Sequence, residues 1–180
     1  GYAFDTVNNQ YCTFYRNGSI GADTSQASAV TNIDYSNALN SYTIPTGWSY
    51  DDIVEFAWDD DATAAIYAFF RNGSVAVDTA QDGCGDMAFT GDAQAWTIPI
   101  DFNISNIIGI AFHSGAGDCG VFFKNLSYVS QTVCETAPPT FNFNTVLTYT
   151  LPAGFNANDA IGVDIDRGAS DIAMFFRNES

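Results

Sequence analysis

Five asparagines in this chain stand two residues before a serine, which is the acceptor pattern for N-linked glycans. These candidate glycosylation sites are Asn17, Asn72, Asn103, Asn125 and Asn178. Glycine follows Asn17 and Asn72, and an Asn-Gly pair also predicts a type I′ hairpin turn, in which glycine supplies a positive φ. Leu126 and Glu179 replace that glycine in two other copies, yet Asn and Ser both stay. The sequence therefore predicts covalent glycans in a host that N-glycosylates.

Aspartates cluster in two loops, and clustered carboxylates supply the hard oxygen ligands that Ca²⁺ takes in sets of six to eight. The candidate calcium ligands are Asp59, Asp61, Asp164, Asp166 and Asp171. Neither loop has EF-hand spacing, and the corresponding third loop offers His113, Ser114 and Asp118 instead. We expect solvated acidic loops, with calcium as the alternative and no cofactor required.

Catalytic patterns find little support in this sequence. His113 is the single histidine of the chain, so a histidine-based triad has one place at most. No glycine-rich phosphate-binding loop is present. We therefore expect a protein that is not an enzyme.

The asparagines recur because the chain is a tandem repeat. The string Phe14-Tyr-Arg-Asn-Gly-Ser19 returns with small changes at 69–74, 122–127 and 175–180, so that Asn17, Asn72, Asn125 and Asn178 are 55, 53 and 53 residues apart. Linkers of the form Tyr/Trp-Thr-Ile/Leu-Pro follow at 42–45, 96–99 and 149–152. The approximate repeats are 1–51, 52–105, 106–158 and a partial 159–180. Together they predict one domain of stacked units, either a processed product or a window of a longer protein.

A basic residue directly precedes four of the asparagines, and these residues are Arg16, Arg71, Lys124 and Arg177. They are four of the 5 basic residues in the chain. We expect each to pair with an aspartate of an adjacent repeat, at the Asp52 or Asp159 position, and to fix how the repeats dock. The alternative is a ring of cations that receives an anionic sugar or a partner carboxylate.

The sequence of each repeat predicts short β-strands. Its apolar segments are β-branched or aromatic, and Gly, Asn, Asp or Pro interrupts them every 8 to 12 residues. Segment 66–71 carries bulky residues on both faces, as a strand between two layers does. We predict an all-β fold with about four antiparallel strands per repeat, arranged as a four-bladed β-propeller. An array of small β-sandwiches or a solenoid is the alternative.

The run Asp52-Ile-Val-Glu-Phe-Ala-Trp58, followed by Tyr67-Ala-Phe-Phe-Arg-Asn-Gly73, resembles a hemopexin-type blade. In that family an acidic residue opens the inner strand and a Tyr-Phe-Phe-basic-Gly string forms the second. Asp159-Ala-Ile-Gly162 with Met174-Phe-Phe-Arg177 repeats the likeness. About half of each repeat is covered, while the family's Tyr-Trp third strand is missing. The resemblance implies a four-bladed propeller that binds partners and does no catalysis.

Four cysteines indicate an oxidising compartment, and without a Cys-x-x-Cys or histidine pair they do not predict a zinc site. Placed on the repeat, Cys12 and Cys119 come just before the aromatic string, whereas Cys84 and Cys134 come shortly after it. A bridge to the next repeat would join Cys84 to Cys119. Cys12 and Cys134 would then pair within a curved ring or between subunits. Four free buried thiols are the alternative.

The charge balance narrows the class of partner. The net charge is −16 and 14% of residues are charged, against about 25% in an average protein. Such a chain is repelled by nucleic acid and by anionic membranes. No apolar run approaches the roughly 18 residues that cross a bilayer. We expect an extracellular or cell-surface protein without membrane insertion.

Two functions fit these observations. The first is a structural or adhesive module of an extracellular fibre or surface layer, whose partners are copies of itself. Its partial fourth repeat would leave strand edges that the next subunit completes in a head-to-tail filament. The second is a secreted lectin, with Trp48, Trp58 or Trp96 stacking on sugars. We favour the structural module.

Overall fold

The computed structural model describes residues 1–5, 8, 10–24, 38–59, 65–79, 83–113, 118–132, 134, 140–166 and 171–177. The predicted all-β class is confirmed, because the described residues form four sheets. Among the described residues the helical segments are three 3₁₀ helices. These are η1 (Tyr50–Asp52), η2 (Ile104–Asn106) and η3 (Ala157–Asp159), and each leads directly into the first strand of a sheet.

Sheets 1 and 2 each have five strands, and their order is β1-β2-β3-β4-β8 and β5-β6-β7-β9-β13. The strands of sheet 1 are β1 (Tyr2–Asp5), β2 (Gln10–Phe14), β3 (Ser19–Asp23), β4 (Ala38–Thr43) and β8 (Met87–Ala88). The strands of sheet 2 are β5 (Ile53–Asp59), β6 (Ala65–Phe70), β7 (Ser74–Asp78), β9 (Thr90–Thr97) and β13 (Thr140–Asn142). In both sheets the first four strands are antiparallel neighbours.

Sheets 3 and 4 are smaller. Sheet 3 has the order β10-β11-β12-β14, and sheet 4 consists of β15 and β16. Their strands are β10 (Ile107–His113), β11 (Asp118–Phe123), β12 (Ser127–Thr132), β14 (Thr145–Thr148), β15 (Ala160–Asp166) and β16 (Asp171–Phe176). Among the described residues, therefore, sheet 3 lacks a fifth strand and sheet 4 lacks its outer half.

The fifth strand of sheets 1 and 2 comes from the following repeat. β8 leaves sheet 2 after β7 and runs back to pair in parallel with β4, where Met87 lies opposite Tyr42. β13 leaves sheet 3 after β12 and pairs in parallel with β9, where Phe141 lies opposite Trp96. The outer edges of sheets 1 and 2 are thus each covered by a strand of a neighbouring repeat.

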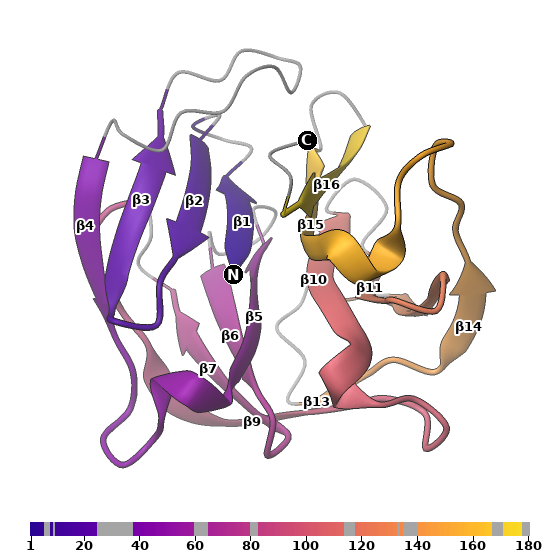
Figure 1. Ribbon diagram of the computed structural model, residues 1–180. Helices are drawn as coiled ribbons and strands as arrows, with labels where there is room; N and C mark the ends of the chain where they lie inside the picture. The colour runs from indigo at the N-terminus through magenta and orange to yellow at the C-terminus, as the bar shows by residue number, and fades with distance from the viewer. Residues whose placement is uncertain are drawn as a thin grey trace.

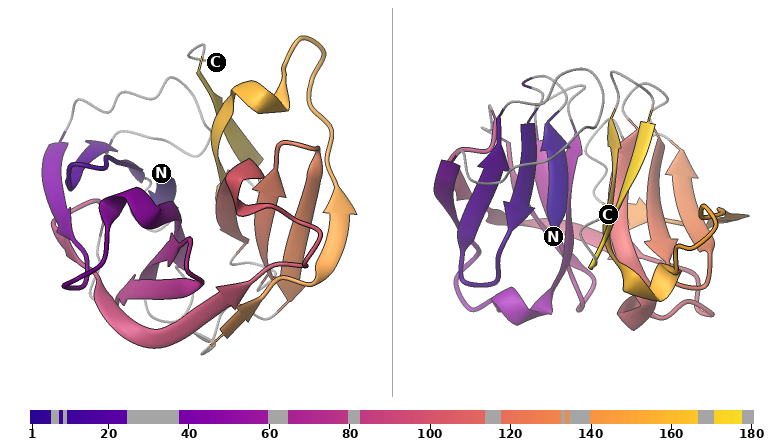
Figure 2. Two further views of the ribbon diagram at one scale, coloured as in Figure 1. Left: turned by 60° about the horizontal axis from the view of Figure 1, so that its bottom comes forward. Right: turned by 45° about the horizontal axis from the view of Figure 1, so that its top comes forward.

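The first strands of the four sheets lie together in the middle of the molecule, whereas β4 and β14 lie at opposite outer edges (Figure 1). β1 contacts β5, β5 contacts β10, β10 contacts β15, and β15 contacts β1. Figure 2 (left) shows the sheets side by side around this centre. Tyr2 of β1 stacks on Phe175 of β16, with ring centroids 4.6 Å apart. Sheet 4 therefore packs against both sheet 3 and sheet 1.

Close approach of the first strands explains two glycines. A Cβ on Gly162 would lie 2.3 Å from the Tyr2 ring, and a Cβ on Gly109 would lie 2.7 Å from Val163. The pairing register shifts at this level in sheets 2, 3 and 4. In sheet 2 the residue there is Glu55, which is buried and accepts hydrogen bonds from the Tyr2 N–H at 2.8 Å and the Phe56 N–H at 3.0 Å. Burial raises the pKa of the Glu55 carboxyl.

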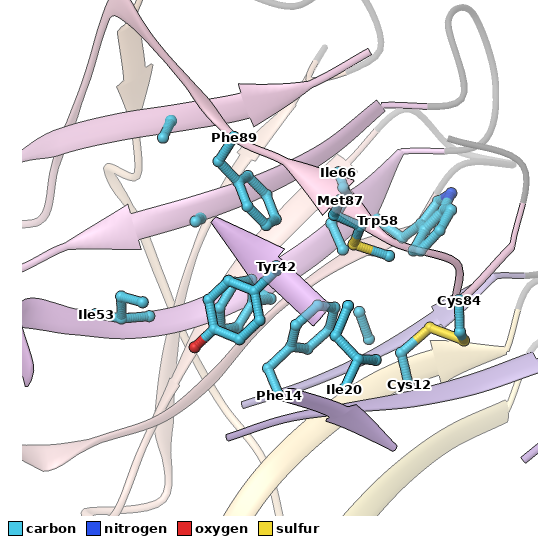
Figure 3. Packing of buried hydrophobic residues seen from close by; sticks show 14 of the residues in the cluster. Cys12, Phe14, Ile20, Tyr42, Ile53, Trp58, Ile66, Cys84, Met87 and Phe89 are labelled. Carbon is cyan, nitrogen blue, oxygen red and sulfur yellow. A yellow bond between two sulfur atoms is a disulfide. The ribbon is translucent and has the colours of Figure 1, made fainter. Parts of the chain in front are cut away.

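Three apolar cores fill the spaces between sheets. The first core, between sheets 1 and 2, includes Phe14, Tyr42, Phe56 and Phe89 (Figure 3). The second core, between sheets 2 and 3, includes Tyr67, Phe112 and Phe141. The third core, between sheets 3 and 4, has fewer buried residues, and several of its members are half-buried. Because sheet 2 is covered on both faces, segment 66–71 carries bulk on both faces as expected.

Two disulfides are present, but the predicted pairing is wrong. Cys12 bonds to Cys84 and Cys119 bonds to Cys134, with Cα atoms 5.6 Å and 6.0 Å apart. The predicted bridge joined Cys84 to Cys119 of the next repeat. The segment after the third strand instead runs back to the preceding sheet, so Cys84 reaches Cys12 beside β8 (Figure 3). No helix among the described residues is long and apolar enough to cross a membrane.

Candidate functional site

Three of the predicted glycosylation asparagines lie exposed in equivalent hairpin turns. Asn17, Asn72 and Asn125 follow the second strands of sheets 1, 2 and 3. The Oδ1 of each accepts the N–H of the serine two residues later, at 3.0, 2.9 and 3.2 Å. The hydroxyls of Ser19 and Ser127 also donate to the asparagine Oδ1. Each sequon therefore forms an Asx-turn at the surface.

The predicted type I′ turn is wrong for these hairpins. Such a turn needs a positive φ at both central residues, and among the described residues Leu126 is the non-glycine residue with positive φ. In the first hairpin the Gly18 N–H donates to the Tyr15 oxygen at 3.0 Å, and the positive φ of 82° falls on Gly18, after Asn17. This is a type I turn followed by a left-handed residue. It leaves Oδ1 of the asparagine free to cap the turn.

Leu126 occupies the left-handed position that Gly18 and Gly73 fill in the other hairpins. Its φ is 65°, against 82° and 84° for the two glycines. A leucine Cβ is strained there by roughly 1 kcal/mol. The turn geometry is thus kept even where its preferred residue is lost.

The other two sequons differ in setting. Asn103 caps η2, with its Oδ1 accepting the Ser105 N–H at 2.9 Å. Ser49 and Asn156 cap η1 and η3 in the same way, and neither belongs to a sequon. Asn178 lies outside the described residues. The hairpin asparagines are therefore the repeated set, and Asn103 is a local addition.

An aromatic donor beside each hairpin was missed by the sequence analysis. The Tyr42 hydroxyl donates to the Tyr15 oxygen at 2.7 Å, and the Tyr149 hydroxyl donates to the Phe123 oxygen at 2.6 Å. In sheet 2 the indole N–H of Trp96 donates to the Phe70 oxygen at 2.8 Å. Each acceptor immediately precedes a cation of the repeat. The signal was available, because these linker positions hold Tyr or Trp and never Phe.

The predicted ion pairs between repeats are largely wrong. Arg16 pairs with Asp51 at 3.1 Å, but both side chains are mostly exposed, at 67% and 82%. Among the described residues no ion pair involves Arg71, Lys124 or Arg177. Their backbone N–H groups instead donate to the oxygens of Asp52, Asn106 and Asp159, at 2.9, 2.9 and 3.0 Å. These backbone contacts extend the pairing of the first and second strands within one sheet and do not join neighbouring repeats. The exposed Arg16–Asp51 pair contributes less than about 1 kcal/mol.

The predicted calcium ligands do not form one site in the described part of the chain. Asp59 and Asp164 are buried in β5 and β15. Asp166 and Asp171 lie opposite each other at the open end of sheet 4, and Asp61 lies outside the described residues. No group of three or more His, Cys, Asp or Glu suited to a metal occurs among the described residues. Calcium binding stays a prediction.

The three tryptophans serve packing in this structure. Trp58 and Trp96 are 4% exposed, and half-buried Trp48 packs edge-on against Phe70 at 4.5 Å. Phe102 and Phe155 pack on Phe123 and Phe176 at the corresponding places. A sugar-stacking role for Trp58 or Trp96 would require the sheets to separate.

An apolar hollow lies beside β14, between sheets 3 and 4. This hollow, named here the β14 groove, has a volume of about 360 Å³. Its lining includes Gly120, Phe122, Tyr128, Leu147, Ile165 and Ile172. Leu147 is 40% exposed and Ile172 is 59% exposed. The outer edge of β14 pairs with no strand among the described residues.

Comparisons with known proteins do not assign a family. No family model matches the chain, and no curated protein matches it. Among solved structures, the crystal structure of the Saccharomyces cerevisiae Sqt1 is similar with a TM-score of 0.38 and 8% sequence identity. The likeness covers 95% of this chain and 41% of that protein, so the chain spans less than half its length. It carries no argument about fold or function. The resemblance to hemopexin-type repeats stays a prediction.

Proposed function

We propose that this chain is a non-catalytic, extracellular structural or adhesive module that assembles with copies of itself and carries N-linked glycans. The observation that supports this most directly is the set of exposed Asx-turns at Asn17, Asn72 and Asn125. An Asx-turn needs only the serine N–H, whereas a sequon needs the serine hydroxyl, which in two of these turns also donates to the asparagine Oδ1. That Ser follows in every copy, while glycine does not, favours a modified turn.

A four-bladed propeller is the finer architecture that we propose. The closed series of contacts β1–β5–β10–β15–β1 supports it, because the innermost strands of a propeller lie side by side around its axis. Within it, sheet 4 is the incomplete blade. Two disulfides support an oxidising, extracellular location.

The hairpin turns and the 3₁₀ helices lie at one end of the sheets, since Arg16 pairs with Asp51 of η1 and the Arg71 N–H donates to the Asp52 oxygen of η1. Glycans on three turns would cover that end with hydrated sugar. Contacts between copies would then use the sides of the molecule, where β14 and β16 present unpaired edges among the described residues.

Carbohydrate binding is a second candidate function, and one hollow favours it. A hollow of about 500 Å³ at the hairpin of sheet 3 brings together Lys124, Asn156 and the 40% exposed ring of Phe155. A cation, an amide and an exposed aromatic ring are groups that hold sugars. This site would bind an anionic sugar at one repeat rather than at all of them.

Intact mass spectrometry and electron microscopy of the native material test the proposal together. We expect a mass above that of the polypeptide, which falls to the polypeptide value after enzymatic removal of N-glycans with Asn converted to Asp at occupied sites. We expect regular filaments in the same sample. An unmodified chain that forms discrete particles contradicts the proposal, and a glycan array then decides the lectin alternative.

A further inference from the structure

Two of the spaces between sheets are closed by a segment with the pattern apolar-x-Phe. In the first core this segment is Met87–Phe89, and in the second core it is Phe141–Phe143. Its first apolar residue lies opposite the aromatic residue of a linker, which is Tyr42 in one case and Trp96 in the other. Its phenylalanine is 3% exposed in the first core and fully buried in the second. The chain therefore contains two filled grooves of one kind.

The third linker is held in the same way as the first two. In each repeat the N–H of the linker aromatic donates to the backbone oxygen of the left-handed residue in the hairpin turn. The three pairs are Tyr42 with Gly18, Trp96 with Gly73 and Tyr149 with Leu126, at 2.7, 2.9 and 3.0 Å. The chain is therefore in place to present the next residue of each linker alike.

That next residue is the threonine whose oxygen holds the docked segment. The oxygens of Thr43 and Thr97 accept the phenylalanine N–H of their segments at 3.0 and 3.1 Å. Thr150 has the same place in the third linker and is exposed, and its oxygen accepts no such N–H among the described residues. The backbone acceptor for a segment is thus present and open at the third linker.

The walls of the β14 groove correspond to the walls around Phe141. Phe69 and Phe112 contact the Phe141 ring in the second core, with ring centroids 5.3 and 5.8 Å away. By position in the repeat, Phe122 corresponds to Phe69 and Ile165 to Phe112, and both line the groove. The groove is therefore the place where a third apolar-x-Phe segment would lie.

The groove is wide and its rim is exposed. Gly120 stands where the second core has Tyr67, and a Cβ on Gly120 would meet its nearest neighbours at 3.6 Å, which is ordinary contact. No close approach therefore requires this glycine, and its missing side chain widens the groove. All 4 residues of β14 are exposed, and so is Ile172, which lines the groove. An exposed apolar edge strand is a ready site for the addition of another strand.

Acidic residues stand where a segment parallel to β14 would enter the groove. The segment enters beside Thr145, at the end of sheet 3 where β11 begins, and Asp118 lines the groove there. Asp166 and Asp171 pair at the corresponding position of sheet 4, next in the chain to two residues that line the groove. Residues that precede the apolar residue of a docked segment therefore lie nearest to negative charge.

We propose that the β14 groove binds an extended segment of a different polypeptide, in which basic residues precede an apolar-x-Phe sequence. The segment runs parallel to β14, its first apolar residue lies opposite Tyr149, and its phenylalanine N–H donates to the Thr150 oxygen. Its basic residues lie beside Asp118. The apolar pattern follows from the two filled grooves, and the basic residues follow from the charge at the entrance and the net charge of −16. This inference goes beyond the proposed function, since it requires neither glycans nor a second copy.

The chain's own segments do not supply the occupant. Met87–Phe89 and Phe141–Phe143 are buried and hydrogen-bonded in their own cores. Asp86 directly precedes the first of them, so a second copy would bring a carboxylate toward Asp118. A net charge of −16 on each copy adds to this repulsion. A basic segment of another protein is attracted instead, and the edge of β16, which also pairs with no further strand among the described residues, is left for contacts between copies.

Binding of synthetic peptides to the 180-residue chain tests the chemistry of the segment. The probe is Lys-Lys-Thr-Phe-Asn-Phe-Asn, which is the sequence of residues 140–144 with two lysines in front. Fluorescence anisotropy of a label at its C-terminus gives the Kd. We expect saturable binding that weakens at least about tenfold when serine replaces both phenylalanines. Glutamate in place of the two lysines is expected to weaken binding about threefold or more, and added salt should reduce this difference.

Matched variants locate the bound segment. Leu147→Asn and Ile172→Asn place an amide in the groove without changing the net charge, and are expected to weaken binding of the lysine peptide at least about tenfold. Gly120→Leu fills the groove and is expected to act alike. Val146→Asn is the control, with an expected change of less than about twofold, since Val146 lies on the same strand, is 55% exposed and does not line the groove. Circular dichroism checks that each variant is folded.

Asp118→Asn separates the charge from the apolar contact. It removes the carboxylate at the entrance of the groove and keeps the shape of the side chain. We expect binding of the lysine peptide to weaken about threefold, and binding of the glutamate peptide not to weaken.

Absence of saturable binding overturns the proposal, as does binding that Leu147→Asn and Gly120→Leu leave unchanged. Equal affinity for the lysine and glutamate peptides also overturns it, because the groove then does not select a basic segment. Sedimentation velocity of the chain alone tests the other occupant, since self-association that Leu147→Asn abolishes would assign the groove to a second copy. A monomeric chain without glycans that binds the lysine peptide as expected supports the groove and contradicts the proposed function, so the two are tested separately.

Discussion

The second and third cores are built from corresponding residues and differ in how far they are closed. In the second core Trp96 is 4% exposed, and Phe141 and Phe143 seal its outer side. In the third core Tyr149 is half-buried, while Leu147 and Ile172 remain exposed beside a groove of about 360 Å³. The difference is the segment that docks beside the linker. The space between two sheets of this chain is therefore closed by a short parallel strand as well as by the four-stranded sheets.

Removal of the disulfides is expected to change the free energy of unfolding most, and by a different amount for each bridge. Cys12–Cys84 spans 72 residues and ties the returning segment to sheet 1, whereas Cys119–Cys134 closes 15 residues within sheet 3. Paired replacement by serine is expected to lower the free energy of unfolding by about 4 kcal/mol for the first bridge and about 3 kcal/mol for the second. Urea unfolding at neutral pH measures both. An equal or reversed order would contradict the view that Cys84 fastens one repeat to another.

Truncation of the docking segment compares a closed and an open core. Phe141→Ala removes a fully buried ring that contacts Tyr67, Phe69 and Phe112, and is expected to cost about 3 kcal/mol or more. Leu147→Ala removes a 40% exposed side chain and is expected to cost less than about 1 kcal/mol. Both values come from urea unfolding of the chain at a dilution where it is monomeric. Similar costs for the two would show that the third core is already sealed.

Removal of one hydroxyl sharpens the same comparison. Tyr42→Phe deletes the bond to the Tyr15 oxygen inside the closed first core, and we expect a loss of about 1.5 kcal/mol. Tyr149→Phe deletes the equivalent bond to the Phe123 oxygen, which water reaches more easily, and we expect about 0.5 kcal/mol. Thermal unfolding of the two variants side by side gives the order. A larger loss at Tyr149 would be inconsistent with an open groove.

The hairpin turns provide a test with the opposite sign. Leu126→Gly relieves the left-handed leucine at φ 65° and is expected to raise the free energy of unfolding by about 1 kcal/mol, net of the lost apolar contact. Gly73→Leu makes the reverse change in the sister turn and is expected to cost a similar amount. Both variants keep the Asn-x-Ser sequence, so the asparagine that caps each turn is unchanged. A neutral or destabilising Leu126→Gly would exclude strain at this position.

The smallest effect at neutral pH is expected at Tyr67. Its buried hydroxyl has no hydrogen-bond partner among the described residues, so Tyr67→Phe should change stability by less than about 0.5 kcal/mol at pH 7. Burial and the nearby Asp59 carboxylate raise the pKa of Tyr67 from 10.0 to about 12.

The unfolded chain loses this proton first, so the Tyr67 contribution is intact below pH 10 and is lost as the pH rises through about 12. Tyr149 behaves alike, since burial raises its pKa to about 12 as well. Urea unfolding between pH 9 and pH 12 should therefore give a shallower decline for Tyr67→Phe than for the parent chain. Identical slopes would contradict the burial of this hydroxyl.

The sequence was sufficient to predict the all-β class. Its short β-branched and aromatic segments are interrupted by Gly, Asn, Asp and Pro, and this pattern depends only on residues close together in the chain. Segment 66–71, with bulk on both faces, correctly indicated a strand between two layers. The disulfide pairing could not be predicted from the sequence. It depends on whether the segment after each third strand runs to the preceding or to the following sheet, and tertiary packing decides this. β8, which is two residues long, carries too little periodicity to be recognised as a strand.

Two features were present in the sequence but read incompletely. The Asn-Gly pairs suggested a type I′ turn, whereas the asparagine caps a type I turn and the next residue takes the positive φ. The linker aromatics are Tyr42, Trp96 and Tyr149. Each has an O–H or N–H group, and such a group needs a hydrogen-bond acceptor when the ring is buried. The prediction relied on the cations of the repeat. In the structure the backbone N–H groups of Arg71, Lys124 and Arg177 form hydrogen bonds, whereas their side chains form no ion pair among the described residues.

Electron cryo-microscopy of the assembled native material tests the central claim most directly, because it resolves what lies against the outer edge of β14. We predict an extended apolar segment parallel to β14, with an aromatic ring between Phe122 and Ile165. A β14 edge that stays open to solvent in the assembled material would contradict the account.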